Sequence, residues 1–248
     1  MKLVPYLFLV VLALVAAGCG GSRESEVAGT TAERCVPGSV ESLRSDRHAY
    51  AGVVRFSARA YRMPGRGVVA TFGKTNVNGH TTVLGVLSAV RGADCKADWY
   101  RVQLPRKPNG ISAYVRAVAV DLIRVRTRIE VDLSERRIVL FRRGRKVLET
   151  TAAIGSAATP TPTGRFYVDQ RLIPSDPSGP FGPGAVGIAA YSEILTGWTQ
   201  GGPIAIHGTN KPWLVGQAVS NGCLRVRNPV LRRIFAAALP GTPVTIRS

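Results

Sequence analysis

The 248-residue sequence lacks the features that usually reveal a zinc site or a membrane-spanning helix. Its four cysteines include no Cys-x-x-Cys pair and only three histidines are present, so the spacing typical of a zinc site is missing. No apolar stretch reaches the ~20 residues that an ordinary membrane-spanning helix needs. Acidic residues are also scarce: 15 Asp and Glu stand against 33 Lys and Arg, which gives a formal net charge of +18.

The positive charge has two interpretations that the sequence leaves open. It comes from 27 arginines and six lysines. In a cytosolic protein this balance would indicate nucleic acid as the partner, whereas an exported chain would meet anionic lipids and acidic polymers of a cell wall. Alternatively, the arginines reflect genome composition and a solvated surface, since no block of like charges stands out.

The beginning of the chain is typical of an export signal. Lys2 precedes a mostly apolar run of about 15 residues, which ends in the small residues of Ala-Ala-Gly-Cys at 16–19. This end resembles the lipobox of bacterial lipoproteins, although Ala16 stands where leucine is usual. We predict a lipoprotein signal peptide over residues 1–19, with Cys19 lipidated. A plain cleaved signal or an uncleaved anchor is the alternative, and each option places the rest outside the cytoplasmic membrane, in the bacterial cell envelope.

Cysteine arithmetic singles out one thiol. If Cys19 carries lipid, three cysteines remain in an oxidising compartment. Cys35 and Cys95 both lie in the N-terminal half, and a disulfide between them would stabilise that half by about 4 kcal/mol in the chain-entropy model. Cys223 is then a free thiol. Lone thiols are often only small buried side chains, so the count alone does not make Cys223 functional.

Composition divides the rest of the chain into a tether and two β-rich domains. Residues 20–47 are polar and lack apolar periodicity, which predicts a flexible tether. Residues 48–125 contain short β-type runs separated by Gly, Pro and Asn. They resemble bacterial SH3-like domains, which accompany wall enzymes; an unrelated small β-barrel is the alternative. The strands predicted here span residues 68–72, 82–87, 99–104 and 113–116.

The second domain, residues 126–248, combines a meander with one helix. We expect a long loop over residues 171–184, rich in Pro and Gly, as a candidate lid. Asn228 is expected to cap the only convincing helix, with Pro229 in its first turn. The strands predicted here span residues 128–133, 137–142, 146–150, 165–168, 187–191, 203–206 and 243–246.

A cysteine and a histidine in this domain form a candidate nucleophile and base. A thiol is a poor nucleophile until it loses its proton, which a neighbouring imidazole can take and later pass to a leaving amine. His207 is the only histidine after residue 125 and ends an apolar strand. A lone histidine at the end of a strand is more often structural. The hypothesis that His207 is a base therefore depends on its pairing with Cys223.

The residues around the cysteine suit acyl transfer. The segment reads Ser220-Asn221-Gly222-Cys223-Leu224-Arg225. Gly222 permits a tight turn whose amides could hold a developing oxyanion. If the following backbone is extended, Arg225 shares a face with the thiol and can bind a carboxylate in a bidentate way.

Three segments together resemble the L,D-transpeptidase catalytic domain of the YkuD family. They are His207-Gly208-Thr209-Asn210, the segment Ser220-Asn221-Gly222-Cys223-Leu224-Arg225 with Cys223 sixteen positions after His207, and Thr161-Pro162-Thr163-Gly164-Arg165-Phe166. The resemblance runs from about residue 126 to residue 246, in the same order of elements. It implies a mixed β-sandwich, so the expected fold class is mainly β: a small SH3-like barrel followed by a YkuD-like sandwich with one clear helix.

The resemblance also implies a reaction on peptidoglycan stem peptides. Cys223 would form a thioester after release of a terminal D-Ala and pass the acyl group to an amine, with His207 as base and the Gly208 carbonyl as its partner. The amides of Gly222 and Cys223 would form the oxyanion hole, with Ser220 and Asn221 beside it, and Arg225 would contact the stem peptide. No metal or organic cofactor is expected. Asn221 departs from the histidine usual in the family, and an amide cannot titrate.

Other functions stay open at this point. An L,D-carboxypeptidase would give the same thioester to water. A non-catalytic cell-wall-binding lipoprotein would use only the basic surface and the first domain, which the retained Cys-His pair argues against. A nucleic-acid partner is disfavoured by the export signal.

Overall fold

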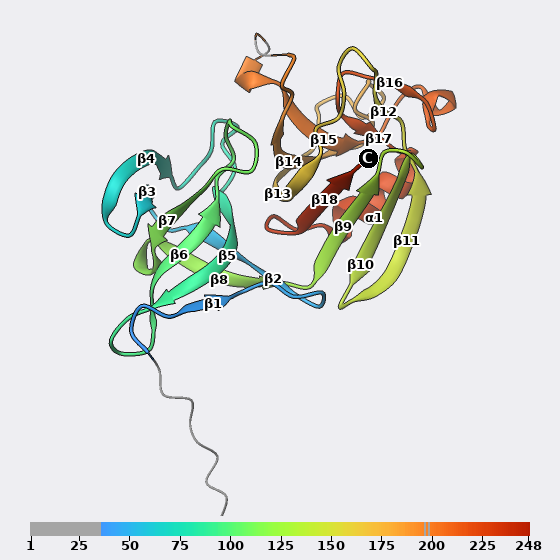
Figure 1. The fold of residues 1–248 in the computed structure, drawn as a ribbon. Helices are drawn as coiled ribbons and strands as arrows, with labels where there is room; N and C mark the ends of the chain where they lie inside the picture. Colours follow the sequence, from blue (N-terminus) through green and yellow to red (C-terminus); the bar gives the residue numbers. More distant parts are fainter. Residues whose placement is uncertain (1–35, 196, 198) are drawn as a thin grey trace, which may run out of the picture. The chain divides into compact units, whose positions relative to one another are not determined.

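The computed structural model describes residues 36–195, 197 and 199–248 (Figure 1). The predicted signal peptide, the lipidation site Cys19, the disulfide candidate Cys35 and most of the predicted tether lie outside the described residues. Within the described part, no helix is both long enough and apolar enough to cross a bilayer. Cys95 is disulfide-bonded and Cys223 is a free thiol.

An antiparallel sheet occupies the first half of the described chain. Its strands follow the order β4-β3-β7-β6-β5-β2-β8, and β1 pairs with β5. They are β1 (Val40–Ser42), β2 (Ala49–Val54), β3 (Ser57–Met63), β4 (Arg66–Gly73), β5 (Val83–Arg91), β6 (Ala97–Gln103), β7 (Ser112–Arg116) and β8 (Val120–Val125), with the 3-10 turn η1 (Ala117–Ala119) before β8. The four strands predicted from the sequence are confirmed as β4 to β7. Alternating small and aliphatic side chains, such as Ala58, Ala60, Leu84 and Val86, form its core.

The predicted tether extends too far into the chain. β1 lies inside residues 20–47, and its Val40 pairs with Val90 of β5. The three side chains of this strand are exposed and bury no apolar surface. The strand is held instead by its backbone hydrogen bonds to β5. The SH3-like resemblance of the whole sheet stays a prediction.

A mixed sheet forms the second half of the chain, with the order β11-β10-β9-β18-β13-β14-β15-β17. Its strands are β9 (Thr127–Asp132), β10 (Arg137–Arg142), β11 (Arg145–Thr151), β13 (Gly164–Leu172), β14 (Ala185–Tyr191), β15 (Pro203–His207), β17 (Leu224–Arg225) and β18 (Pro243–Arg247). The chain also contains the small pair β12 (Ile154–Gly155) and β16 (Ala218–Ser220), the 3-10 turns η2 (Thr199–Gly201) and η3 (Pro212–Leu214), and the helix α1 (Asn228–Ala237).

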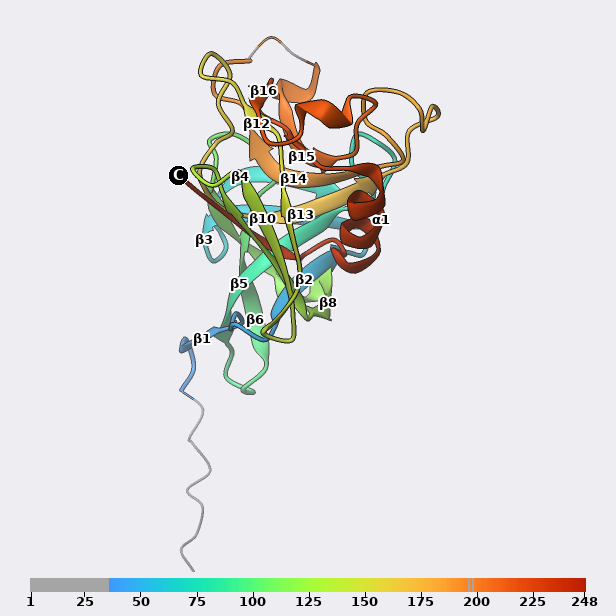
Figure 2. The same cartoon turned by 90° about the vertical axis from the view of Figure 1, so that its right-hand side faces the viewer.

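The pairing of β13 turns this sheet into a sandwich. Residues 164–167 pair with β18, whereas residues 168–172 pair with β14. The antiparallel meander β9-β10-β11 is confirmed, and the parallel pairs β9–β18 and β15–β17 make the sheet mixed, as expected. The core between the layers contains Phe166, Ile188, Ile206 and Leu224, and α1 contacts β14 and β15 (Figure 2). The described chain is therefore mainly β with a single α-helix.

Two details differ from the sequence-based expectation. The long loop begins at Ile173 rather than Arg171, because β13 continues to Leu172 in register with β14. The N-cap of α1 is Arg227, which makes no side-chain cap. Asn228 is already helical, and its side chain serves another segment, described below.

A buried tyrosine joins the two sheets. Tyr167 of β13 is fully buried, and its hydroxyl donates a hydrogen bond of 3.1 Å to the Val83 carbonyl of β5. Gly85 makes room for the ring, because a Cβ there would lie 2.7 Å from Tyr167 Cδ1. The Gln103 amide of β6 donates to the Arg165 carbonyl at 2.7 Å. These contacts bring loops of the first sheet beside β13 and β14.

Candidate active site

The parallel pair β15–β17 places His207 and Arg225 on one face, and Cys223 directly precedes β17. Ile206 lies opposite Leu224 and His207 lies opposite Arg225. Ile206 and Leu224 are fully buried in the core, so alternation turns His207 and Arg225 to the other face. Cys223 precedes Arg225 by two positions, and its Sγ lies 3.9 Å from the Pro203 carbonyl oxygen of β15.

His207 is held as a neutral base. Its Nδ1 lies 2.6 Å from the Gly208 carbonyl oxygen. Because a carbonyl only accepts, we assign the proton to Nδ1, which leaves Nε2 as the basic atom. Burial lowers the pKa of His207 to about 4, an effect that the Gly208 carbonyl opposes and the Arg225 charge reinforces. The imidazole is therefore uncharged at neutral pH.

The thiol is also uncharged at rest. Burial raises the pKa of Cys223, while a backbone hydrogen bond at Ala205 and the charge of Arg225 partly oppose this effect. A raised thiol pKa beside a lowered imidazole pKa describes a neutral pair.

A glycine turn and a buried serine shape the backbone at the nucleophile. Gly222 has a φ of +105°, and a Cβ there would lie 2.9 Å from Ile204 Cδ1, so the position favours glycine. Ser220 Oγ accepts from the Gly222 amide at 3.1 Å and donates to the Cys223 carbonyl at 2.5 Å. The Gly222 amide, expected in an oxyanion hole, is thus occupied within the turn.

Thr161 locks this turn to the neighbouring strand. Its buried hydroxyl donates to the Gly222 carbonyl at 2.9 Å and accepts from the Gly155 amide at 2.9 Å. Gly155 has no room for a side chain, since a Cβ would lie 2.5 Å from the Thr159 carbonyl oxygen. The segment that resembles the family's Thr-Pro-Thr-Gly motif therefore holds the turn that precedes Cys223.

Thr161→Val tests this support. The substitution keeps the shape but leaves the Gly155 amide and the Gly222 carbonyl without partners, at a cost of roughly 1–3 kcal/mol for each unpaired group. We expect unfolding at a lower urea concentration, and slower reaction of the Cys223 thiol with a substrate analogue that carries a thiol-reactive group. The exposed Thr163→Val is the matched control. Equal urea midpoints in the two variants would contradict the role of the hydroxyl.

Arg225 has the character of an anion-binding group. Its backbone pairs with Ala153, with N–O distances of 2.8 and 2.9 Å in the two directions. Its Nε is buried, yet no described residue accepts a hydrogen bond from it. A buried guanidinium nitrogen without a partner favours binding of an oxygen anion from outside the chain.

The segment after the base is held by a residue that sequence reasoning assigned elsewhere. Asn228 Oδ1 accepts from the Thr209 amide at 2.8 Å. The same oxygen lies so close to Gly208 and Gly182 that neither could carry a Cβ. An asparagine before Pro229 looks like a helix cap, so only the structure reveals that it positions the Gly208 carbonyl.

The candidate lid covers one side of the base. The Phe181 ring, from the loop of residues 173–184, lies 4.9 Å from the His207 ring. Phe181 is itself half-exposed. Asn221, by contrast, is exposed, and its side chain makes no hydrogen bond to another described residue. In the described part of the chain no group of three or more His, Cys, Asp and Glu could hold a metal ion.

Comparison with known proteins points to the same half of the chain. Residues 126–246 match the family model YkuD, described as L,D-transpeptidase catalytic domain. Two proteins named putative L,D-transpeptidase YkuD, from Bacillus licheniformis and Bacillus subtilis, are 37% identical over 119 residues and 36% identical over 118 residues. Each alignment covers 48% of this chain and 64% of the relative, so the chain spans less than two thirds of these relatives.

A solved structure also matches this half. The catalytic domain from E. faecium L,D-transpeptidase is 26% identical, with 49% of this chain and 96% of that chain covered and a TM-score of 0.36. The family model and the two Bacillus relatives support the resemblance that the motifs predicted for residues 126–246.

Proposed function

We propose that this chain, whose second half matches the L,D-transpeptidase catalytic domain, is a peptidoglycan L,D-transpeptidase with Cys223 as nucleophile. The observation that carries the proposal is the pairing of His207 with Arg225 across β15 and β17, with Cys223 directly before β17 and its Sγ against the backbone of β15. It combines a neutral base, a free thiol and an unpaired cation, which together suit acyl transfer from a substrate that bears a carboxylate.

The first half-reaction forms the thioester. Cys223 Sγ attacks the carbonyl carbon of the amide that precedes the terminal D-Ala, and the thiol proton passes to His207 Nε2. The carbonyl oxygen becomes an oxyanion, for which we propose the Cys223 amide as donor, because the Gly222 amide is occupied. The carbon–nitrogen bond then breaks, and His207 returns the proton to the D-Ala nitrogen.

The second half-reaction transfers the acyl group. An amine attacks the thioester carbon, a new carbon–nitrogen bond forms, and the carbon–sulfur bond breaks. His207 carries a proton from the amine to the leaving sulfur, which restores the thiol. Arg225 would hold a carboxylate of the stem peptide, and the Phe181 loop would limit the entry of water. If water attacks instead of the amine, the product is that of an L,D-carboxypeptidase.

Incubation of the purified full chain with disaccharide-tetrapeptide tests the proposal. Mass spectrometry should show free D-Ala and a cross-linked dimer that has lost one D-Ala. Tripeptide without any dimer would instead favour the carboxypeptidase. If no product forms and a carbapenem leaves no adduct on Cys223, the non-catalytic wall-binding function replaces the enzyme.

We also propose that the enzyme is lipid-anchored outside the cytoplasmic membrane of a bacterium. This rests on the lipobox-like residues 16–19 alone. Recovery of the full chain from the soluble fraction, without lipid on Cys19, would contradict it.

An arginine groove formed mainly by β10, β11 and their turn, together with the end of the first sheet, suits an anionic wall polymer. Six exposed arginines line it with Gly144 and Val147, around a volume of about 1130 Å³, and none of the six forms an ion pair within the described residues. They are Arg47, Arg124, Arg126, Arg142, Arg143 and Arg145. Like charges gathered without counter-ions favour a polyanion.

Neutralising this arginine groove should weaken polyanion binding. We expect the triple variant Arg124→Gln, Arg126→Gln, Arg142→Gln to bind polyphosphate on the order of tenfold more weakly at low salt, with a smaller salt dependence. The triple Arg62→Gln, Arg66→Gln, Arg232→Gln removes the same charge from exposed positions elsewhere. Equal losses in both triples, measured by fluorescence titration, would mean that only net charge matters.

A further inference from the structure

Two apolar side chains project from neighbouring turns of the first sheet. Phe56 lies in the turn between β2 and β3 and is 80% exposed, more than any other aromatic side chain of the described residues. Val118, in η1 between β7 and β8, is 77% exposed. The Arg55 amide donates to the Ala119 carbonyl at 3.1 Å, which joins the two turns. Both apolar side chains therefore lie outside the core, next to each other in the fold.

Arginines surround the two exposed side chains. Arg55, Arg59 and Arg116 line the same hollow as they do, and its volume is about 480 Å³. No acidic side chain of the described residues lines this hollow. Arg55 forms an ion pair of 2.7 Å with Asp121, whereas neither Arg59 nor Arg116 pairs with an acidic group in the described part of the chain. The hollow therefore carries a surplus of positive charge.

The sheet holds two of these arginines in outward positions. Arg59 of β3 and Arg116 of β7 each alternate with buried side chains, so both point away from the core. The Arg116 guanidinium lies 4.6 Å from the centroid of the Trp99 ring, and the Tyr61 ring meets Trp99 edge-on at 5.5 Å. A cation–π contact fixes the direction of a guanidinium group without neutralising its charge. Arg116 is thus positioned and still able to bind an anion.

This surface, which we call the tip patch, differs from the arginine groove. In the groove six arginines stand with one apolar side chain, Val147, and charge alone suffices for a polyanion. The tip patch adds two exposed apolar groups, which gain free energy only when something covers them. A membrane surface with anionic lipids offers both phosphate groups and an apolar boundary beneath them. The tip patch consists of Arg55, Phe56, Arg59, Arg116 and Val118.

We propose that the tip patch docks on a membrane surface that contains anionic phospholipids. Phe56 and Val118 enter the headgroup region, and the arginines bind lipid phosphates. Arginine suits this position because its N–H donors bind phosphate oxygens in a bidentate way while its aliphatic stem lies along apolar surface. The inference concerns the first sheet and depends neither on the reaction proposed above nor on a lipid at Cys19.

Other occupants fit the tip patch less well. A two-fold dimer through this surface would bring the arginines of one copy against those of the other, and like charges across an interface repel. An acidic polymer would bind the arginines but leave Phe56 and Val118 in water. A lipid surface satisfies both kinds of side chain.

Quenching by brominated lipid measures insertion in the full chain. Phe56→Trp places an indole in the tip patch, and Val77→Trp places one at a position that is 84% exposed and lies outside the patch. Both positions are exposed, so both variants should unfold at the urea midpoint of wild type. Each is mixed at low salt with vesicles of phosphatidylcholine and phosphatidylglycerol whose acyl chains carry bromine. We expect the fluorescence that Phe56→Trp gains over wild type to fall by roughly half, and that of Val77→Trp to stay unchanged.

Charge variants test the role of the lipid phosphate. In the Phe56→Trp background, the pair Arg59→Gln, Arg116→Gln removes two charges from the tip patch. The matched pair Arg232→Gln, Arg233→Gln removes two charges from exposed positions of α1. The quenched fraction, followed as the content of phosphatidylglycerol rises, gives the equilibrium constant of docking. We expect the first pair to lower this constant on the order of tenfold and the second pair to lower it by less than about twofold.

Several results would overturn the inference. Equal quenching of Phe56→Trp and Val77→Trp would mean that the chain adsorbs without a preferred face, and no quenching of either would mean that the patch stays in water. Quenching that survives the loss of Arg59 and Arg116 would remove the lipid phosphates from the account. A blue shift of the Phe56→Trp emission that grows with protein concentration, without vesicles, would assign the patch to a second copy. None of these results changes D-Ala release, so the proposed reaction is judged separately.

Discussion

Cys223→Ala should abolish both release of D-Ala and formation of a covalent intermediate. The thiol is the only free one in the described chain, and the proposed mechanism gives no other side chain the role of nucleophile. Whole-protein mass spectrometry after incubation with disaccharide-tetrapeptide measures the intermediate directly. Cys223 is half-buried and small, so the urea midpoint of the variant should stay close to that of wild type.

The folding control decides what a loss of activity means. A variant that unfolds like wild type yet forms no adduct identifies Cys223 as the nucleophile. Residual D-Ala release at more than a trace of the wild-type rate would require a different nucleophile and would reject the mechanism.

His207→Ala should lower the rate of thioester formation on the order of 10²–10⁴-fold, the usual contribution of a positioned general base. The pKa of His207 is lowered to about 4, so its basic form is present above that pH and is lost as the pH falls through it. Wild type should therefore keep its acylation rate down to about pH 5 and lose it below, as followed by D-Ala release in stopped samples. The variant should lack this fall in rate at low pH, which we call the acid limb of the pH profile.

A variant at the lid provides the matched comparison. In the wild type the centroids of the Phe181 and His207 rings lie 4.9 Å apart. Phe181→Ala leaves His207 in place but removes this cover, so water should reach the imidazole. Because burial is the largest cause of the lowered pKa, the acid limb should move to higher pH. An acid limb that stays in place in both variants would belong to another group.

Local patterns were sufficient to predict most of the elements and to select a candidate cysteine and histidine. The meander β9-β10-β11, the helix near Asn228 and the closing strand β18 follow from alternation and from Gly, Pro and Asn punctuation, which act over a few residues. Cys223 and His207 stand out because few residue types can perform nucleophilic catalysis and the chain has few of them. Short strands such as β1 and β12 were not predicted from the sequence, because their stability comes from pairing with a partner strand.

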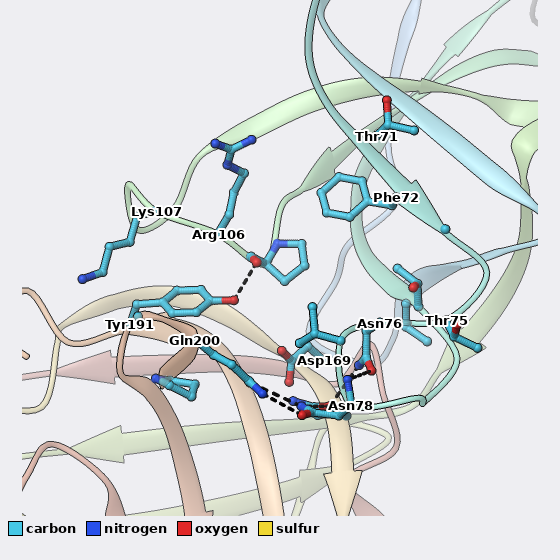
Figure 3. Close-up of a pocket in the computed structure, with 18 residues that line it drawn as sticks. Thr71, Phe72, Thr75, Asn76, Asn78, Arg106, Lys107, Asp169, Tyr191 and Gln200 are labelled. Atoms are coloured by element: carbon cyan, nitrogen blue, oxygen red, sulfur yellow. Dashed lines mark hydrogen bonds between the residues drawn. The ribbon is translucent and has the colours of Figure 1, made fainter. Parts of the chain in front are cut away.

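Long-range pairing decided the rest. The parallel register of β15 with β17 sets His207 opposite Arg225, and no local signal encodes which strand lies beside which. The bond from Thr161 to the Gly222 carbonyl spans 61 positions, and the bond from the Thr209 amide to Asn228 spans 19. Asp169 reads in the sequence as one residue of a strand. Only the packing of β13 against the first sheet buries its carboxylate in the wall of a cavity (Figure 3), because burial is a property of the folded chain.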